Sequence, residues 1–348
     1  MNLTEEIIVK LSKRHFYDLL VFNNPTANIN GNKVEIADVI ILVDKIILCI
    51  QAKERNHSTS SSDEYKWFEE RVVTKANRQH KATLKYLLNN EIEFKNSSLS
   101  KKIKYDRNEH SICYITIFKN HYISEYTRYH KSETLGTYPI FSLESFSQVC
   151  DELMTPIDII RFIPFRVNMS IQYEEKYKGS YLIEVKYDEE HTGFISDFSD
   201  PNLITMFVVQ SELIDKTATM VQTKRFIIYI EELIAQKNNI DNKDEINIAN
   251  MVLSKYSLLD SRKIKDFFDC VDTVSNDISQ YGIMDLSDGS KIIFFNSHYI
   301  DKDKEKIYYH FEHELFQEGI IVFADDKRIY SSYQDFRNIE VIPSLIKK

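Results

Sequence analysis

The chain has 348 residues, of which 43% are hydrophobic and 28% are charged, so its composition excludes a disordered chain and favours a globular protein of two domains. Its net charge of −9 excludes a protein that coats nucleic acid through overall positive charge. Its four cysteines show no CxxC spacing, which excludes a zinc knuckle and a disulfide framework. The longest apolar run, Val39–Ile50, is interrupted by Asp44 and Lys45 and is too short for a membrane span, so we expect a cytoplasmic protein.

The first 53 residues predict a helix followed by strands. Apolar residues at helical spacing predict a helix from Leu3 to about Phe16, and Phe16–Phe22 is typical of a strand. Val34–Val43 and Ile46–Gln51 predict two strands joined by a tight turn at Asp44 and Lys45. Both strands are apolar on both faces, which is typical of the covered sheet of an α/β protein.

The rest of the first half continues this pattern. Glu64–Asn89 predicts one or two helices, and Thr155-Pro156 marks the start of another. We expect an α/β domain over residues 1–168 and an α+β domain over residues 169–348, whose role is recognition, oligomerisation or regulation. The further predicted strands are Ser111–Phe118, Tyr138–Ser142, Tyr181–Tyr187, Leu203–Val209 and Ile292–Asn296, and the further predicted helices are Phe141–Cys150, Pro156–Ile163, Thr223–Gln236, Glu245–Leu253 and Ser261–Val274.

Three polar residues lie at the ends of the two apolar strands around Asp44 and Lys45. In an antiparallel hairpin with this turn, Asp38 faces Gln51, and the alternation of side chains places Lys53 on the face of Gln51. Burying these groups without partners would be unfavourable. The Asp38 carboxylate, the Gln51 side-chain carbonyl and the Ala52 backbone carbonyl are hard oxygen donors, so the set predicts a Mg²⁺ or Mn²⁺ site, with Lys53 beside the attacking water. The alternative is a structural ion pair between Asp38 and Lys53.

The arrangement of Asp38, twelve intervening residues and Gln51-Ala52-Lys53 resembles the core of the PD-(D/E)XK nuclease superfamily, particularly its Mrr-like and NERD-like branches. The resemblance covers roughly residues 1–165. It implies a three-layer α/β/α restriction-endonuclease-like core with a mixed sheet, Mg²⁺-dependent hydrolysis of phosphodiester bonds, and a prokaryotic defence or restriction setting. It also implies a glutamate on the first helix, at Glu5 or Glu6 with Glu5 favoured, and a glutamine at Gln79. Acidic residues in a first helical turn also interact favourably with the helix dipole, which is the alternative role of Glu5 and Glu6.

A basic stretch indicates where nucleic acid would bind; the alternative is an ordinary solvated helix face. From Lys66 to Arg107 there are eleven Lys and Arg residues against five Asp and Glu, and Lys75, Arg78 and Lys81 lie next to Gln79. The first hypothesis is therefore a metal-dependent deoxyribonuclease, with RNA as the alternative substrate. Because Gln51 makes the site less anionic and the second half is acidic, the second hypothesis is an inactive nuclease-like subunit that binds nucleic acid, a partner protein or a second copy of the chain.

Overall fold

The computed structural model describes residues 3–29, 31–56, 60–97, 99–123, 126–176, 183–186, 192–195, 200–210, 216–277, 281–297, 318–324 and 329–335. The chain divides into two compact units, Met1–Ile214 and Asp215–Lys348. Among the described residues, no helix combines the length and hydrophobicity needed to cross a membrane.

A six-stranded mixed sheet forms the centre of the first unit, and its strand order is β1-β4-β5-β8-β10-β9. β5, β8 and β10 are parallel to one another, whereas β1, β4 and β9 pair antiparallel to their neighbours. The expected α/β class and mixed sheet are therefore confirmed. The strands of this sheet are β1 (Val21–Asn23), β4 (Val39–Val43), β5 (Ile46–Glu54), β8 (Ser111–Lys119), β9 (Tyr129–Ser132) and β10 (Gly136–Ser142).

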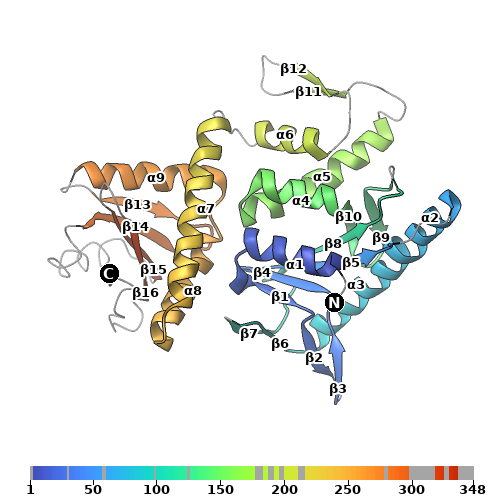
Figure 1. Ribbon diagram of the computed structural model, residues 1–348, viewed down its shortest axis with the longest axis horizontal. Coiled ribbons are helices and arrows are strands. Elements are labelled where there is room, and N and C mark those ends of the chain that lie inside the picture. Colours follow the sequence, from blue (N-terminus) through green and yellow to red (C-terminus); the bar gives the residue numbers. More distant parts are fainter. Residues whose placement is uncertain are drawn as a thin grey trace. The chain divides into compact units, whose positions relative to one another are not determined.

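Helices cover both faces of this sheet (Figure 1). On one face, Leu84 and Leu87 of α3 pack in a buried cluster with Ile40, Ile47 and Cys49 of the strands. α1 and α4 contact each other and pack on the same sheet, and α5 packs on β10. The helices of this unit are α1 (Leu3–His15), α2 (Ser61–Trp67), the π-helix η2 (Phe68–Lys75), α3 (Ala76–Asn89), α4 (Leu143–Leu153), α5 (Pro156–Lys176) and α6 (Asp200–Gln210), with a 3₁₀ turn η1 at Asp18–Leu20.

Three two-stranded hairpins complete the first unit. They are β2 (Thr26–Ile29) with β3 (Asn32–Glu35), β6 (Ile92–Lys95) with β7 (Ser100–Ile103), and β11 (Ile183–Lys186) with β12 (Thr192–Ile195). The first hairpin corrects one expectation, because Val34 and Glu35 pair with β2 rather than extending the strand that begins at Val39.

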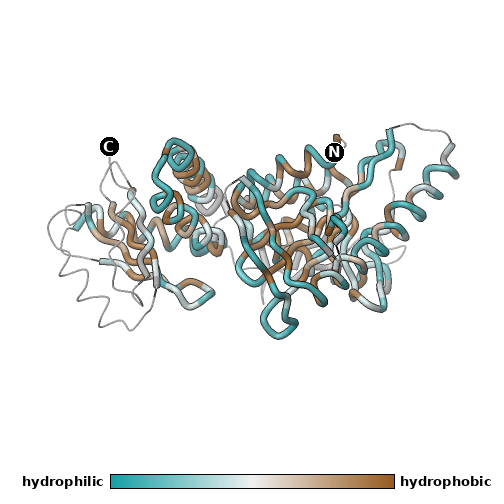
Figure 2. The backbone as a smooth tube through the Cα atoms, turned by 90° about the horizontal axis from the view of Figure 1, so that it is seen from below, coloured by the Kyte–Doolittle hydropathy of each residue, from teal (hydrophilic) through white to brown (hydrophobic). Residues whose placement is uncertain are grey.

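The described residues of the second unit form three helices followed by a four-stranded mixed sheet in the order β13-β14-β15-β16. α9 packs on β13, β14 and β15, and α8 packs on β16, so helices and strands are segregated along the chain as expected of an α+β unit. Within each unit, hydrophobic residues gather toward the interior and hydrophilic residues lie mainly along the outside (Figure 2). The elements are α7 (Lys216–Asn238), α8 (Lys243–Tyr256), α9 (Ser261–Asn276), β13 (Gly282–Asp285), β14 (Lys291–Asn296), β15 (Glu318–Ala324) and β16 (Ile329–Asp335).

Three further expectations differ from the structure. Phe16–Phe22, expected as a strand, contains the 3₁₀ turn η1, and β1 begins only at Val21. The boundary expected between residues 168 and 169 lies inside α5, whose Arg166 is fully buried and bonded to Asp200 of α6, so α6 belongs to the first unit. Leu203–Val209, expected as a strand, is the helix α6. Short apolar runs do not separate buried strands from buried helices, and Asp200-Pro201 supplies the residues that start a helix.

Candidate nuclease-type site

The candidate site begins at the hairpin of β4 and β5. Val39 pairs with Ile50 and Val43 with Ile46, and one further step of this register places Asp38 opposite Gln51, as the turn position predicts. Asp44 adopts a positive φ of 51°, a conformation that Asp tolerates better than most residues. Because β4 is antiparallel to β5, the start of β4 and the end of β5 meet at one edge of the sheet. The carboxyl ends of the parallel strands β8 and β10 lie at the same edge.

Three oxygen atoms converge on the Lys53 ammonium group at this edge. Its Nζ atom lies 2.8 Å from the Ala52 carbonyl oxygen, 3.4 Å from Gln51 Oε1 and 3.6 Å from Asp38 Oδ2. The Ala52 N–H donates to the same Asp38 oxygen at 2.6 Å. Asp38, Gln51 and Lys53 are all buried, with exposed fractions of 7%, 1% and 8%. The structure therefore joins the polar groups of the hairpin into one small buried cluster.

Burial and neighbouring charges shift the pKa values of two groups here. Burial lowers the pKa of Lys53, and although Asp38 opposes this shift, the nearby charge of Lys75 adds to it. The pKa of Glu35 is raised by burial, and the negative charges of Asp38 and Glu5 raise it further. The carboxylate of Glu35, at the end of β3, therefore interacts electrostatically with those of Asp38 and Glu5.

A pocket of about 420 Å³ opens beside the buried cluster. Its walls come from α1, the start of β4, the end of β5 and the helical segment from α2 to α3, so residues far apart in the sequence meet there. Its lining residues are Glu5, Asp38, Ala52, Lys53, Glu54, Trp67, Arg71, Lys75 and Gln79.

Most of the residues singled out in the sequence meet at this pocket. Gln51 lies directly behind the lining and contacts Lys53. Of the two glutamates on α1, Glu5 lines the pocket, whereas Glu6 is exposed to solvent and does not. Of the three basic residues expected to contact nucleic acid, Lys75 lines the pocket, and Arg78 and Lys81 lie on the exposed face of α3.

The sequence reasoning missed Trp67, Arg71 and Glu54 as pocket residues. Trp67, Arg71, Lys75 and Gln79 recur every four residues along one continuous helical segment. In a regular α-helix this spacing would drift around the axis, but the π-helical turn η2 is wider and keeps the four side chains on one face. The spacing of four residues was visible in the sequence and could have indicated these pocket residues. The π-helical turn could not be predicted from the sequence.

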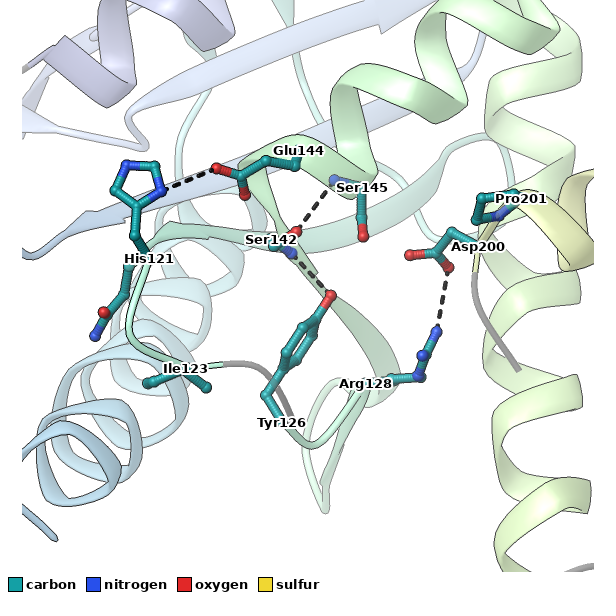
Figure 3. Close-up of a pocket in the computed structure, with 10 residues that line it drawn as sticks. His121, Ile123, Tyr126, Arg128, Ser142, Glu144, Ser145, Asp200 and Pro201 are labelled. Carbon is teal, nitrogen blue, oxygen red and sulfur yellow. Dashed lines mark hydrogen bonds and ion pairs between the residues drawn. The ribbon is translucent and has the colours of Figure 1, made fainter. Parts of the chain in front are cut away.

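A second pocket of about 370 Å³ lies at the ends of β8 and β10 (Figure 3). Its polar groups are already paired with one another. Arg128 lies 3.6 Å from Asp200, His121 lies 3.7 Å from Glu144, and the Ser142 N–H donates to Tyr126 Oη at 3.0 Å. These pairings favour a structural role for this pocket.

The first pocket holds oxygen atoms of the kind that a divalent cation binds. Within the part of the chain that the structure describes, no three His, Cys, Asp or Glu side chains converge on one point. The donors are instead one carboxylate, one side-chain amide oxygen and one backbone carbonyl, all within 3.6 Å of Lys53 Nζ, and these are the hard oxygen donors that Mg²⁺ prefers. Gln79 Oε1 is also buried with no hydrogen-bond partner among the described residues. A cation would fit among these oxygens if the Lys53 side chain turned outward.

Comparison with protein-family models, curated proteins and solved structures finds no match to this chain.

Proposed function

We propose that this chain is a metal-dependent nuclease that hydrolyses phosphodiester bonds in DNA. The observation that carries the proposal is the convergence of Asp38, Gln51, the Ala52 carbonyl and Lys53 at the wall of a pocket that also holds Arg71 and Lys75. The resemblance of this motif to the PD-(D/E)XK superfamily supports a restriction-endonuclease-like core and a role in prokaryotic defence.

Each of these residues would have a separate role in such a reaction. Asp38, Gln51 and the Ala52 carbonyl would hold Mg²⁺ or Mn²⁺, which supplies polarisation of the phosphate and a bound water of lowered pKa. Lys53, once turned from these oxygens, would orient the attacking water and offset charge on the phosphate. Arg71 and Lys75 lie on the helical wall of the same pocket, where they would hold the phosphate backbone of the substrate.

A second candidate function is a nuclease-like module that binds without catalysis. It is favoured by one observation: the Lys53 ammonium already contacts all three oxygens and so neutralises them without a metal. In that case Asp38 and Lys53 are a structural ion pair. The two candidates differ in whether Mn²⁺ displaces Lys53.

The test is cleavage of end-labelled duplex DNA, single-stranded DNA and RNA in the presence of Mg²⁺, Mn²⁺ or EDTA. We expect metal-dependent cleavage of DNA by the wild type, reduced about 100-fold or more in Asp38→Asn and Lys53→Met because each removes a group beside the reacting phosphate. Glu6→Gln, an exposed change on α1, is the matched control and should cleave normally. Equal cleavage by the wild type and by both pocket variants would contradict the proposal.

A further inference from the structure

Two buried polar side chains attach α3 to the sheet directly behind the pocket. His80 and Thr83 are both fully buried, although most residues in the layer between α3 and the sheet are apolar, such as Leu84, Leu87 and Cys49. Hydrophobic residues would fill this layer without the desolvation that buried polar groups require. The burial of His80 and Thr83 therefore indicates a role other than filling the layer between α3 and the sheet.

His80 bonds to the strand that lies beside Gln51. Its Nε2 atom lies 3.3 Å from Thr116 Oγ1, and Thr116 is the register partner of Gln51 in the parallel pair of β5 and β8. Tyr114 and Tyr138 hold the imidazole edge-on, with ring centroids 5.1 Å away in each case. Burial, assisted by the charge of Lys53, lowers the pKa of His80 to about 3, so the ring is neutral at physiological pH.

Thr83 bonds to the segment that carries Asp38. Its hydroxyl donates to the backbone carbonyl of Ile36, two residues before Asp38, and lies 3.1 Å from the carbonyl of Gln79. The two bonds together connect α3 to β8 beside Gln51 and to the segment before β4 that leads to Asp38. A directional bond at each point fixes the rotation of the helix more narrowly than apolar contacts do.

The rotation of α3 decides which side chains face the pocket. Lys75 and Gln79 line it, and His80 is the next residue after Gln79. A turn of the helix that broke the bond from His80 to Thr116 would therefore move Gln79, whose Oε1 atom has no hydrogen-bond partner among the described residues, away from Asp38 and Lys53.

We propose that His80 is a positioning residue of the pocket: by bonding to Thr116 it holds α3, and the end of η2 that continues into it, at the rotation in which Lys75 and Gln79 line the pocket with Asp38 and Lys53. The inference rests on the proposed function, because it assigns His80 to the support of Lys75 and Gln79, which line the pocket beside the proposed metal-binding residues. His80 does not touch the substrate or the metal; it acts through Thr116 and through the helix that it anchors.

The test compares three variants of the full chain by Mn²⁺ calorimetry and thermal unfolding. His80→Phe keeps the aromatic contacts but loses the bond to Thr116, and we expect its Mn²⁺ affinity to fall about 10-fold, because the buried Gln79 oxygen beside the proposed ligands would be withdrawn. His80→Gln places an amide near the position of Nε2 and should keep the affinity of the wild type. Leu87→Ala, on the same helix but in its apolar row, should lower the unfolding temperature without changing Mn²⁺ affinity.

A crystal structure of His80→Phe separates this inference from the proposed function. We expect α3 to be rotated or shifted, with Gln79 withdrawn from the pocket. An unchanged α3 together with unchanged Mn²⁺ affinity would overturn the inference while leaving the nuclease proposal intact. If the wild type itself binds no Mn²⁺, the nuclease proposal fails, and the position of Gln79 in the variant alone decides whether His80 positions the helix.

Discussion

At the scale of residues, the candidate site depends on where the Lys53 ammonium lies. Its contacts with Asp38, Gln51 and the Ala52 carbonyl satisfy a buried charge without other ligands. Burial lowers the pKa of this amine, so Lys53 gives up its proton more readily than an exposed lysine. The same three oxygens are the donors of the proposed cation, so Lys53 and the metal compete for one position.

The relation between Asp38 and Gln51 could be predicted because it depends on a local feature, the two-residue turn at Asp44 and Lys45. The choice between Glu5 and Glu6 could not. Both lie in the first turn of α1, and which one faces the pocket is decided by the rotation of that helix against the sheet, a long-range packing property that the helical spacing leaves open.

Exchanging each glutamate of α1 for glutamine tests that placement. Glu5→Gln should lower metal-dependent cleavage about 10-fold, because it removes a carboxylate from the pocket. Glu6→Gln should leave the rate unchanged, because Glu6 is exposed to solvent. Initial cleavage rates at a fixed Mg²⁺ concentration measure both effects, and a larger loss in the Glu6 variant would show that α1 is rotated differently.

Asp200 gives a prediction about pH. Burial alone would raise its pKa, but the charge and hydrogen bonds of Arg166 outweigh burial and hold the pKa below its usual value. The carboxylate therefore stabilises the fold at pH values above its unfolded pKa of about 4, and this contribution is lost as the pH falls through the lower, native pKa. Asp200→Asn should cost about 3 kcal/mol or more at pH 7, because Arg166 would remain buried without its charged partner. Urea unfolding from pH 7 to pH 2 should show the two proteins converging in acid; a constant difference would contradict this account.

At the scale of elements, the segment from α2 through η2 to α3 forms the basic wall of the pocket. A regular apolar pattern predicted the helix here, and the family resemblance implied Gln79, which lines the pocket. The sequence did not reveal the π-helical turn, which aligns Trp67 and Arg71 with Lys75 and depends on tertiary packing rather than on composition. The prediction was wrong at α6, where a short apolar run indicated a strand but the structure has a helix.

The salt dependence of DNA binding tests the role of this wall. Lys75→Ala should weaken binding and lower the slope of log affinity against log salt by about 0.9, the value for one lost phosphate contact on duplex DNA. Lys10→Ala, an exposed change on α1, should leave the slope unchanged. Both substitutions are made in an Asp38→Asn parent, which should not cleave DNA. Fluorescence anisotropy of labelled duplex DNA then measures the affinity of each protein at several salt concentrations. Identical slopes for Lys75→Ala and the parent would place DNA elsewhere.

At the scale of the whole molecule, the complete candidate site belongs to the unit Met1–Ile214. We expect a fragment of residues 1–214 to fold and to keep metal-dependent cleavage. A fragment ending at residue 168 should unfold at a lower temperature, because it ends within α5 and leaves Arg166 buried without Asp200. Circular dichroism measures the unfolding temperature of each fragment, and the cleavage assay measures its activity. Equal unfolding temperatures would indicate that the domain boundary lies within α5.

The most direct test of the central claim is a crystal of the full chain soaked in Mn²⁺ and measured at a wavelength where manganese scatters anomalously. The account predicts an anomalous peak bounded by the Asp38 carboxylate, Gln51 Oε1 and the Ala52 carbonyl oxygen, with the Lys53 ammonium displaced from these atoms. The contradictory result is a pocket with no anomalous peak at saturating Mn²⁺ and Lys53 still in contact with all three oxygens.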